Sequence, residues 1–209
     1  MEREISNVRH LNNYFIKDSP EGDYPASSDV IRETNELYLR HLMTEIRRVG
    51  LEPPQLGSSE TGGYSSSRRF RSLRSMADRF ENSQQRRWVR EQAQNVDLDS
   101  LNAHTFQELL SGLFEQGGIT CERVLVLFYF CADLSIRALQ EKISGYFLQI
   151  YFWTTCYISG RLAFWIEKQG GWAALLPGSV GYLSFNWSYA GMFIIGILAT
   201  CFFMRNFKK

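Results

Sequence analysis

Apolar residues recur at intervals of three and four along most of the chain, which is the spacing of one face of an α-helix. The first such stretch begins at Ser28, which can cap a helix, and runs to Val49, before Gly50. Its loose apolar stripe consists of Val30, Ile31, Leu37, Leu42, Met43 and Ile46. Residues 51–67 are rich in Pro, Gly and Ser, and we interpret them as a flexible loop.

Further helices are predicted by the same spacing and by capping residues. Residues 68–95 are predicted to form one helix or a pair of helices. Thr105 and Glu108 match a capping box, in which side chains of the first turn satisfy free backbone amides; the helix that it opens would end at residues 117–118. Thr120 can cap the next helix. No alternation typical of strands recurs, so the sequence predicts an all-α fold.

Two stretches of the sequence have no polar face. Residues 124–132 are all uncharged, and residues 146–160 are also uncharged and rich in aromatic side chains. A helix that is apolar all round belongs in the centre of a bundle or in a membrane, and neither stretch is long enough for a comfortable membrane span. We therefore expect a central hairpin of two apolar helices, wrapped by amphipathic ones.

The C-terminal residues are predicted to form a membrane anchor. Residues 187–204 would span roughly 27 Å at about 1.5 Å per residue, close to the roughly 30 Å of a bilayer's hydrocarbon core. Aromatic side chains suit one interface and basic side chains the other. The predicted anchor residues are Trp187, Tyr189, Phe193, Ile194, Ile195, Leu198, Arg205, Lys208 and Lys209. The alternative is a hydrophobic helix buried in the chain's own core.

This pattern divides the chain into three parts. We expect a flexible N-terminal segment (1–27), a helical bundle (28–184) that contains the loop 51–67, and a C-terminal tail anchor (185–209). The 209 residues are enough for one domain with one hydrophobic core, and 44% apolar residues exclude a wholly disordered chain.

Charge and candidate chemistry exclude further classes. The formal net charge of +1 argues against a dedicated nucleic-acid binder. His10, His41 and His104 have no metal-ligand spacing, the four cysteines stand singly, and no phosphate-binding or hydrolase motif is present. We therefore predict that the chain is not an enzyme and needs no metal and no cofactor. The cysteines indicate free thiols in a reducing compartment.

The stretch between residues 68 and 90 is rich in arginine. Its eight arginines are Arg68, Arg69, Arg71, Arg74, Arg79, Arg86, Arg87 and Arg90. Such a stripe can bind phosphates of nucleic acid or anionic lipid, or it can be a solvated helix face. Apolar residues line one side of the stretch at helical spacing, which suits a helix that lies in a hydrophobic groove and equally suits ordinary core packing.

Three segments resemble the homology motifs of the Bcl-2 family. Residues 114–130 (FEQGGITCERVLVLFYF) resemble the first motif, residues 165–176 (WIEKQGGWAALL) the second and residues 73–80 (LRSMADRF) the third. The resemblance covers roughly residues 28–209. It implies a bundle of eight or nine helices around a central apolar hairpin, and a regulator of apoptosis at the mitochondrial outer membrane. A cytosolic resting state and a location at the endoplasmic reticulum membrane are the alternative localisations.

The resemblance also assigns roles to residues. The third-motif helix would carry Phe70, Leu73, Met76, Ala77, Asp78 and Phe80. The groove that accepts such helices would contain Arg123, Val124, Leu127, Phe128 and Trp172. By similarity, Asp78 would form a charge-assisted pair with Arg123 of the groove. The first motif departs from the family pattern at Glu122, where the family has glycine, and a side chain there can crowd or repel an incoming helix.

The family contains pore-forming effectors and protective guardians with one fold, so the fold does not decide between them. Residues 123–139 and 169–176 look more like those of the effectors. We therefore favour an effector that opens, forms homo-oligomers through its third-motif helix and permeabilises the membrane. The alternatives are a guardian that binds third-motif helices of effectors, and an anchored scaffold whose arginine-rich helix binds lipid or nucleic acid. The implied partners are other family members, further copies of this chain and mitochondrial membrane lipids, with no nucleic acid expected.

Overall fold

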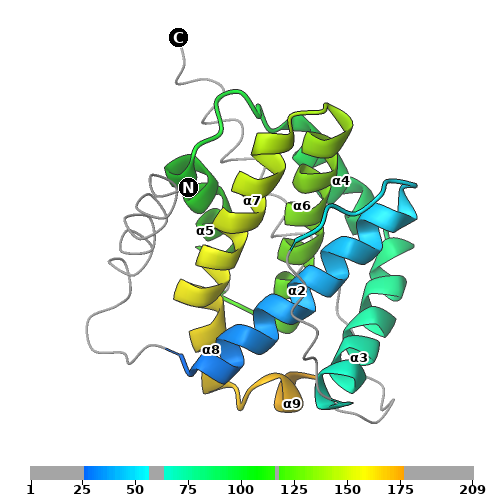
Figure 1. The fold of residues 1–209 in the computed structure, drawn as a ribbon. Coiled ribbons are helices and arrows are strands. Elements are labelled where there is room, and N and C mark those ends of the chain that lie inside the picture. The colour runs from blue at the N-terminus through cyan, green and yellow to red at the C-terminus, as the bar shows by residue number, and fades with distance from the viewer. Residues whose placement is uncertain (1–25, 57–63, 116–117, 177–209) are drawn as a thin grey trace.

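The computed structural model describes residues 26–56, 64–115 and 118–176 (Figure 1), and these residues form helices and no strand, as predicted. The elements are α2 (Ser28–Arg48), α3 (Tyr64–Glu81), α4 (Gln84–Asn95), α5 (Ala103–Glu115), α6 (Cys121–Gln140), α7 (Ser144–Tyr157), the π-helical turn η1 (Ile158–Leu162), α8 (Ala163–Lys168) and α9 (Trp172–Leu175). The predicted anchor (185–209) and residues 1–25 of the predicted N-terminal segment lie outside the described residues. Among the helices that are described, none is long and apolar enough to cross a membrane.

Helix α6 is the centre of the bundle, and every residue from Arg123 to Ala132 is buried. It packs against α2, α4, α5 and α7, so the uncharged run found in the sequence is enclosed on all sides. The chain reverses after α6 through Lys142, whose φ of 58° is left-handed, and α7 returns along α6. The central apolar hairpin predicted from the sequence is therefore present.

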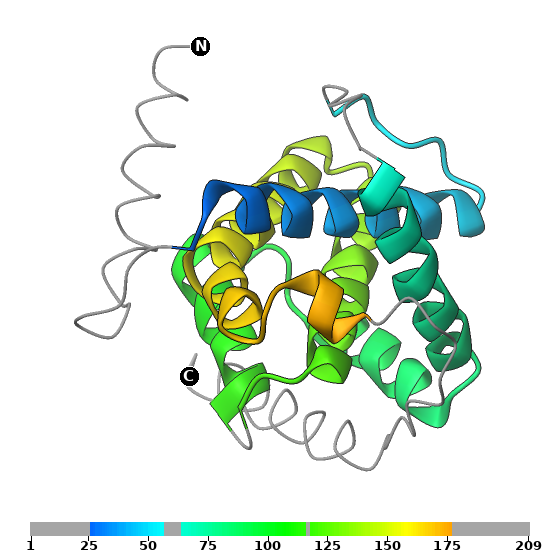
Figure 2. The ribbon, with the colours of Figure 1, turned by 90° about the horizontal axis from the view of Figure 1, so that it is seen from below.

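Helix α2 crosses one side of the bundle. Figure 2 shows α3 near one of its ends and α8 near the other, and α2 contacts both of these helices as well as α6. The first residue of α2 is Ser28, so the predicted cap at this position is wrong by one residue. The N-cap is Ser27, whose side chain makes no capping bond. Its backbone N–H instead donates to the carboxylate of Glu167 at 3.0 Å, which holds the start of α2 against α8.

The predicted cap of α6 is confirmed and that of α5 is corrected. Thr120 accepts a hydrogen bond from the backbone N–H of Arg123 at 3.3 Å. Helix α5 begins three residues earlier than predicted, because Asn102 is its cap: Oδ1 of Asn102 accepts from the backbone N–H groups of His104 and Thr105. Thr105 supplies the returning bond of this box, since its hydroxyl accepts from the N–H of Asn102 at 3.0 Å.

The arginine-rich stretch forms two helices rather than one. Helix α3 ends at Glu81, and α4 begins after Ser83, whose hydroxyl accepts from the backbone N–H of Arg86 at 3.2 Å. The predicted loop 51–67 is too long at its C-terminal side, because α3 already begins at Tyr64. The glycines and prolines of the loop end at Gly63, so nothing in the sequence opposes a helix from the next residue onward.

Two consecutive glycines shape the second-motif segment. Gly170 and Gly171 have φ values of 88° and 76°, in the region that favours glycine. The N–H of Gly171 donates to the carbonyl of Ile166 at 2.8 Å, which ends α8. The turn directs Trp172 into the core, where its indole N–H donates to Thr34 Oγ1 of α2 at 2.9 Å. The Gly-Gly-Trp sequence thereby closes the bundle against α2.

Candidate functional site

Helix α3 presents an apolar stripe to the core. Leu73, Met76, Ala77 and Phe80 are buried, at positions that share one helix face. Phe70 extends this stripe toward the start of the helix, is partly buried, and lies 5.8 Å from the guanidinium carbon of Arg40 on α2. The structure therefore brings together the apolar residues that the third-motif resemblance assigned.

Tyr129 of α6 lies beneath this stripe. Its ring centroid is 5.1 Å from that of Phe80, and its hydroxyl donates to the backbone carbonyl of Ala77 at 3.0 Å. A carbonyl in the middle of a helix already accepts one backbone bond, so the tyrosine uses the second lone pair of that oxygen. This hydrogen bond ties α3 to the central helix.

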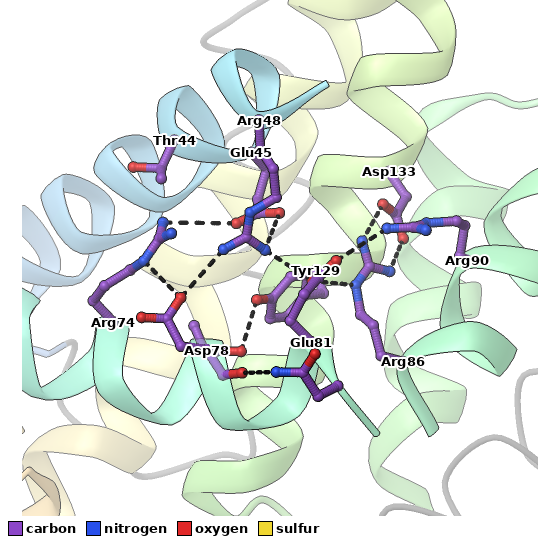
Figure 3. A network of polar contacts seen from close by, with 12 residues as sticks. Thr44, Glu45, Arg48, Arg74, Asp78, Glu81, Arg86, Arg90, Tyr129 and Asp133 are labelled. Atoms are coloured by element: carbon purple, nitrogen blue, oxygen red, sulfur yellow. Dashed lines mark hydrogen bonds and ion pairs between the residues drawn. The ribbon is translucent and has the colours of Figure 1, made fainter. Parts of the chain in front are cut away.

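Ion pairs tie α3 to α2 (Figure 3). Asp78 Oδ1 lies 3.2 Å from Arg48 Nη2 and 3.0 Å from Arg74 Nε. Arg48 also reaches two glutamates, with Nη1 at 3.2 Å from Oε2 of Glu45 and at 3.0 Å from Oε2 of Glu81. Arg48 thus joins one carboxylate of its own helix to two carboxylates of α3.

The same chain of contacts continues to α4 and α6. Arg86 forms a two-pronged pair with Asp133, with nitrogen–oxygen distances of 2.5 and 2.7 Å, and its Nε lies 3.0 Å from Glu81. The Arg86 guanidinium also lies 4.4 Å from the ring centroid of Tyr129. Arg90 reaches the other oxygen of Glu81 at 3.2 Å. We call this set the polar network: Glu45, Arg48, Arg74, Asp78, Glu81, Arg86, Arg90, Tyr129 and Asp133.

Burial and charge act against each other in the polar network. Burial raises the pKa of Asp133, and the neighbouring Arg86 opposes that rise. Burial raises the pKa of Glu45 as well, against the attraction of Arg48. Burial also opposes ionisation of Glu81, yet Arg86 and the other surrounding arginines hold its pKa below the usual value. Glu81, which contacts three arginines, is therefore the carboxylate that favours its charged form most clearly.

A neutral histidine lies beside the network. His41 of α2 is 2% exposed and meets the ring of Tyr129 edge-on at 4.5 Å. Burial lowers its pKa to about 3, and the arginines Arg86, Arg74 and Arg48 lower it further in the same direction. The imidazole is therefore uncharged at neutral pH.

The predicted groove residues are all buried in this structure. Arg123, Val124, Leu127 and Phe128 lie on α6, and Trp172 opens α9. The rings of Phe128 and Trp172 lie 6.5 Å apart. The predicted groove residues thus lie in the interior, where the bundle itself covers them.

The predicted pair of Asp78 with Arg123 does not form within one chain. Asp78 faces α2, where Arg48 is its partner, and Nη1 of Arg123 donates to the carbonyl of Gly118 at 2.8 Å. The reason is the orientation of α3: its apolar stripe faces α6, so Asp78 lies at the edge of the helix next to α2. A pair between Asp78 and Arg123 of a second copy stays a prediction.

Glu122, the departure from the first motif, has a local explanation. It lies in the first turn of α6 and is partly exposed, and a carboxylate near a helix N-terminus is favourable. Burial, followed by the charge of Glu122, raises the pKa of the Cys121 thiol to about 12. Cys121 is therefore a poor nucleophile. In the part of the chain that the structure describes, no group of His, Cys, Asp and Glu side chains could hold a metal ion.

The sequence did not point to five members of the polar network: Glu45, Arg48, Glu81, Tyr129 and Asp133. A signal was available for two of them. Glu45 falls beside Ile46 on the apolar side of α2, and Asp133 directly follows the uncharged run 124–132. A charge inside an apolar stripe has to be paired when it is buried. Such positions predict a partner, although they do not say which.

These features define an all-α bundle that holds an amphipathic helix by an apolar stripe and by ion pairs. A family model described as "Apoptosis regulator proteins, Bcl-2 family" matches residues 73–172, from the middle of α3 to the start of α9. "Apoptosis regulator BAX" of Bos taurus is 29% identical over 183 residues, which cover 87% of this chain and 92% of that protein. The human protein of the same name is 28% identical over the same length. "Bcl-2-like protein 1" of Sus scrofa is 24% identical over 136 residues, 60% of this chain and 58% of that protein.

The chain is therefore similar to the Bcl-2 family of apoptosis regulators. Family members are regulators rather than enzymes in general, and nothing in the described residues indicates catalysis.

Proposed function

We propose that this chain is a pro-apoptotic effector. It releases α3, exchanges this helix with a second copy, and permeabilises the mitochondrial outer membrane, to which residues 185–209 attach it. The observation that carries the proposal is the way α3 is held, by one apolar stripe and by ion pairs at its edge. The relatives named BAX support it, since this chain matches 92% of the bovine protein but 58% of the porcine Bcl-2-like protein 1.

The contacts between α3 and α2 are weak enough to be exchanged. The side chains of Asp78 and Arg48 are 53% and 28% exposed, and ion pairs of this exposure contribute about 0–1 kcal/mol each. An activating third-motif helix that binds the opened form better than the closed form shifts the population toward opening by that difference in affinity. The ion pairs therefore add a small free-energy cost to opening and do not prevent it.

The exchanged helix has a defined place to bind in a second copy. Leu73, Met76 and Phe80 would bury their side chains against Val124, Leu127 and Phe128 of the other copy, and Asp78 would approach its Arg123. Arg123 is 2% exposed in the closed chain, so the bundle has to open before this pair can form. A charge pair that forms in such a buried place fixes the register of the exchanged helix.

Two substitutions with opposite expected effects test this proposal. Arg48→Gln removes the contacts of α2 with Asp78 and Glu81 and leaves every exchanged residue intact, so dye release from vesicles of mitochondrial lipid composition should need about fivefold less activating peptide. Asp78→Ala weakens the closed state only slightly but removes the pair proposed for the dimer, so release should fall strongly.

Each substitution has a matched control. Arg47 is the exposed neighbour of Arg48 and makes no ion pair among the described residues, so Arg47→Gln should behave as the parent protein. Asp29 is an exposed carboxylate of α2 that pairs with Arg32, and Asp29→Ala controls for the loss of one negative charge. The helix-exchange proposal is wrong if each variant matches its control. If this protein releases no dye by itself but inhibits the release caused by a BAX-type effector, the guardian function is supported instead, to which the Bcl-2-like relatives also point.

A further inference from the structure

The helices α3 and α4 carry a larger net positive charge than the whole chain does. Residues 64–95 contain eight arginines and three carboxylates (Asp78, Glu81 and Glu91), a net charge of +5, whereas the whole chain carries +1. The remainder of the chain is therefore net negative. Such an asymmetry gives the molecule a basic side, and the structure shows which arginines remain available there.

Four arginines of this segment face carboxylates. Arg69 pairs with Glu33 of α2, and Arg74, Arg86 and Arg90 belong to the polar network. The side chains of Arg68, Arg71 and Arg79 differ from these. All three are exposed, and none forms an ion pair with a described residue. We call Arg68, Arg71 and Arg79 the basic ridge.

The three residues of the basic ridge share the outer face of α3. At about 100° per residue they fall within an arc of roughly 80°, opposite the buried stripe of Leu73 and Phe80. The ridge is roughly 16 Å long at about 1.5 Å per residue, and exposed Ser75 lies between its arginines. The cations are therefore arranged along a line on a rigid helix and do not converge on one point.

The next helix, α4, adds an exposed arginine and an exposed aromatic side chain. Arg87 of α4 is exposed and has Gln84 of its own helix as its hydrogen-bond partner. Trp88 beside it is 38% exposed, an unusual exposure for so large an apolar side chain. Tryptophan is enriched where proteins meet the interfacial layer of a membrane, and arginine is attracted to anionic headgroups.

We propose that the basic ridge binds the surface of a membrane that contains anionic lipids. A line of cations suits a plane of lipid phosphates better than a single bound phosphate, which several groups would have to surround. The exposed Trp88 and the near-neutral charge of the whole chain favour a lipid surface over nucleic acid. The surface belongs to the closed chain, so it serves an effector and a guardian alike and does not depend on pore formation.

The test is binding of the full chain to vesicles of phosphatidylcholine with and without about 30 mol% phosphatidylserine, at low and at high salt. The predicted anchor would bind both kinds of vesicle regardless of salt. The readout is therefore the additional binding to vesicles with phosphatidylserine that disappears at high salt. Replacing Arg68, Arg71 and Arg79 together by Gln should weaken this part about 100-fold, or about fivefold per arginine.

A control of equal charge separates the ridge from net charge. Arg47, Lys142 and Lys168 are exposed cations outside the ridge, and replacing all three by Gln changes the net charge by the same amount. This control should keep most of the salt-sensitive binding. Ser75→Glu keeps every arginine but places a carboxylate between Arg71 and Arg79, and it should weaken binding as well.

Three results would overturn the proposal. The first is an equal loss in the ridge variant and its control, which would assign binding to net charge. The second is salt-sensitive binding that the ridge variant retains in full. The third is parent protein that binds a single-stranded RNA probe and shows no preference for anionic vesicles. Peptide-triggered dye release by the ridge variant is measured in parallel, since weakened salt-sensitive binding with unchanged release would support the ridge independently of the proposed effector function.

Discussion

Replacing Arg86 by methionine should destabilise the bundle by about 3–5 kcal/mol, the cost of leaving a buried charge without its partner. The side chains of Arg86 and Asp133 are 3% and 9% exposed, and both nitrogens at the tip of Arg86 contact Asp133. Methionine keeps the packing of the arginine stem but provides no donor. The loss therefore arises from Asp133, whose carboxylate stays in the interior between α4 and α6.

The pH dependence of this loss follows from Asp133. Burial already holds its folded-state pKa above the usual value, and removing Arg86 would raise it further. A carboxyl group with a raised folded-state pKa binds a proton in the folded chain at a pH where the unfolded chain has released it. Its contribution to stability is therefore largest below the unfolded pKa of about 3.9 and is lost as the pH rises through the folded pKa. The penalty of Arg86→Met should accordingly shrink between pH 7 and pH 5.

Urea unfolding at the two pH values measures the penalty. Arg87→Met on the exposed side of the same helix is the control and should change stability by less than about 0.5 kcal/mol. Adding Asp133→Asn to Arg86→Met should recover part of the loss, because the uncompensated charge is gone. A penalty below about 1 kcal/mol, or one that does not change between pH 7 and pH 5, would refute this account of the pair.

Three further predictions concern stability. Burial lowers the pKa of His41 to about 3, so His41 stays neutral in the folded chain at pH 5, where the unfolded chain takes up a proton. The free energy of unfolding of the parent should therefore fall by about 2 kcal/mol between pH 7 and pH 5, and urea titrations of His41→Leu should lack this fall. Gly171→Ala should cost about 1–3 kcal/mol in thermal unfolding because its φ of 76° and ψ of −177° suit glycine, whereas Gly145→Ala within α7 should cost nothing. Thr34→Val should cost about 1–3 kcal/mol by removing the acceptor of the Trp172 indole, and a neutral variant would show that water replaces it.

Local sequence patterns predicted the helices better than the ends of the helices. The uncharged run 124–132 allowed one placement, in the centre, because a helix without a polar face has to be enclosed. The start of α5 was different, since Asn102–Thr105 and Thr105–Glu108 both have the spacing of a capping box. Either box satisfies the amides of a first turn, so local chemistry does not decide between them. In the structure the helix begins at Ala103, and Asn102 is its cap.

The polar network could not be read from the sequence in the same way. Arg86 and Arg87 are neighbours of identical chemistry, yet one is buried and the other exposed. The difference is the face of α4: Arg86 lies in line with buried Val89 and Ala93, and Arg87 does not. That alignment indicates burial, but the partner of Arg86 is on α6, 47 residues further along the chain. The pairing depends on how two helices lie against each other, and no spacing within one helix determines that.

The arrangement of the polar network also bears on the proposed release of α3. If α3 leaves, its carboxylates Asp78 and Glu81 leave with it. Arg48 then still has Glu45 of α2 at 3.2 Å, and Arg86 still has Asp133 of α6 at 2.7 Å. Asp78 in turn keeps Arg74, which lies four residues before it on the same helix.

Within the polar network, no buried charge is therefore left without a partner, which is the situation that costs about 3–5 kcal/mol when one partner of a buried pair is removed. The free energy of releasing α3 is set chiefly by its apolar stripe, at about 1.5–3 kcal/mol for each large buried side chain. A competing helix with a similar stripe can supply the same kind of contact. The polar network thus specifies where α3 rests in the closed chain while adding little to the cost of removing it.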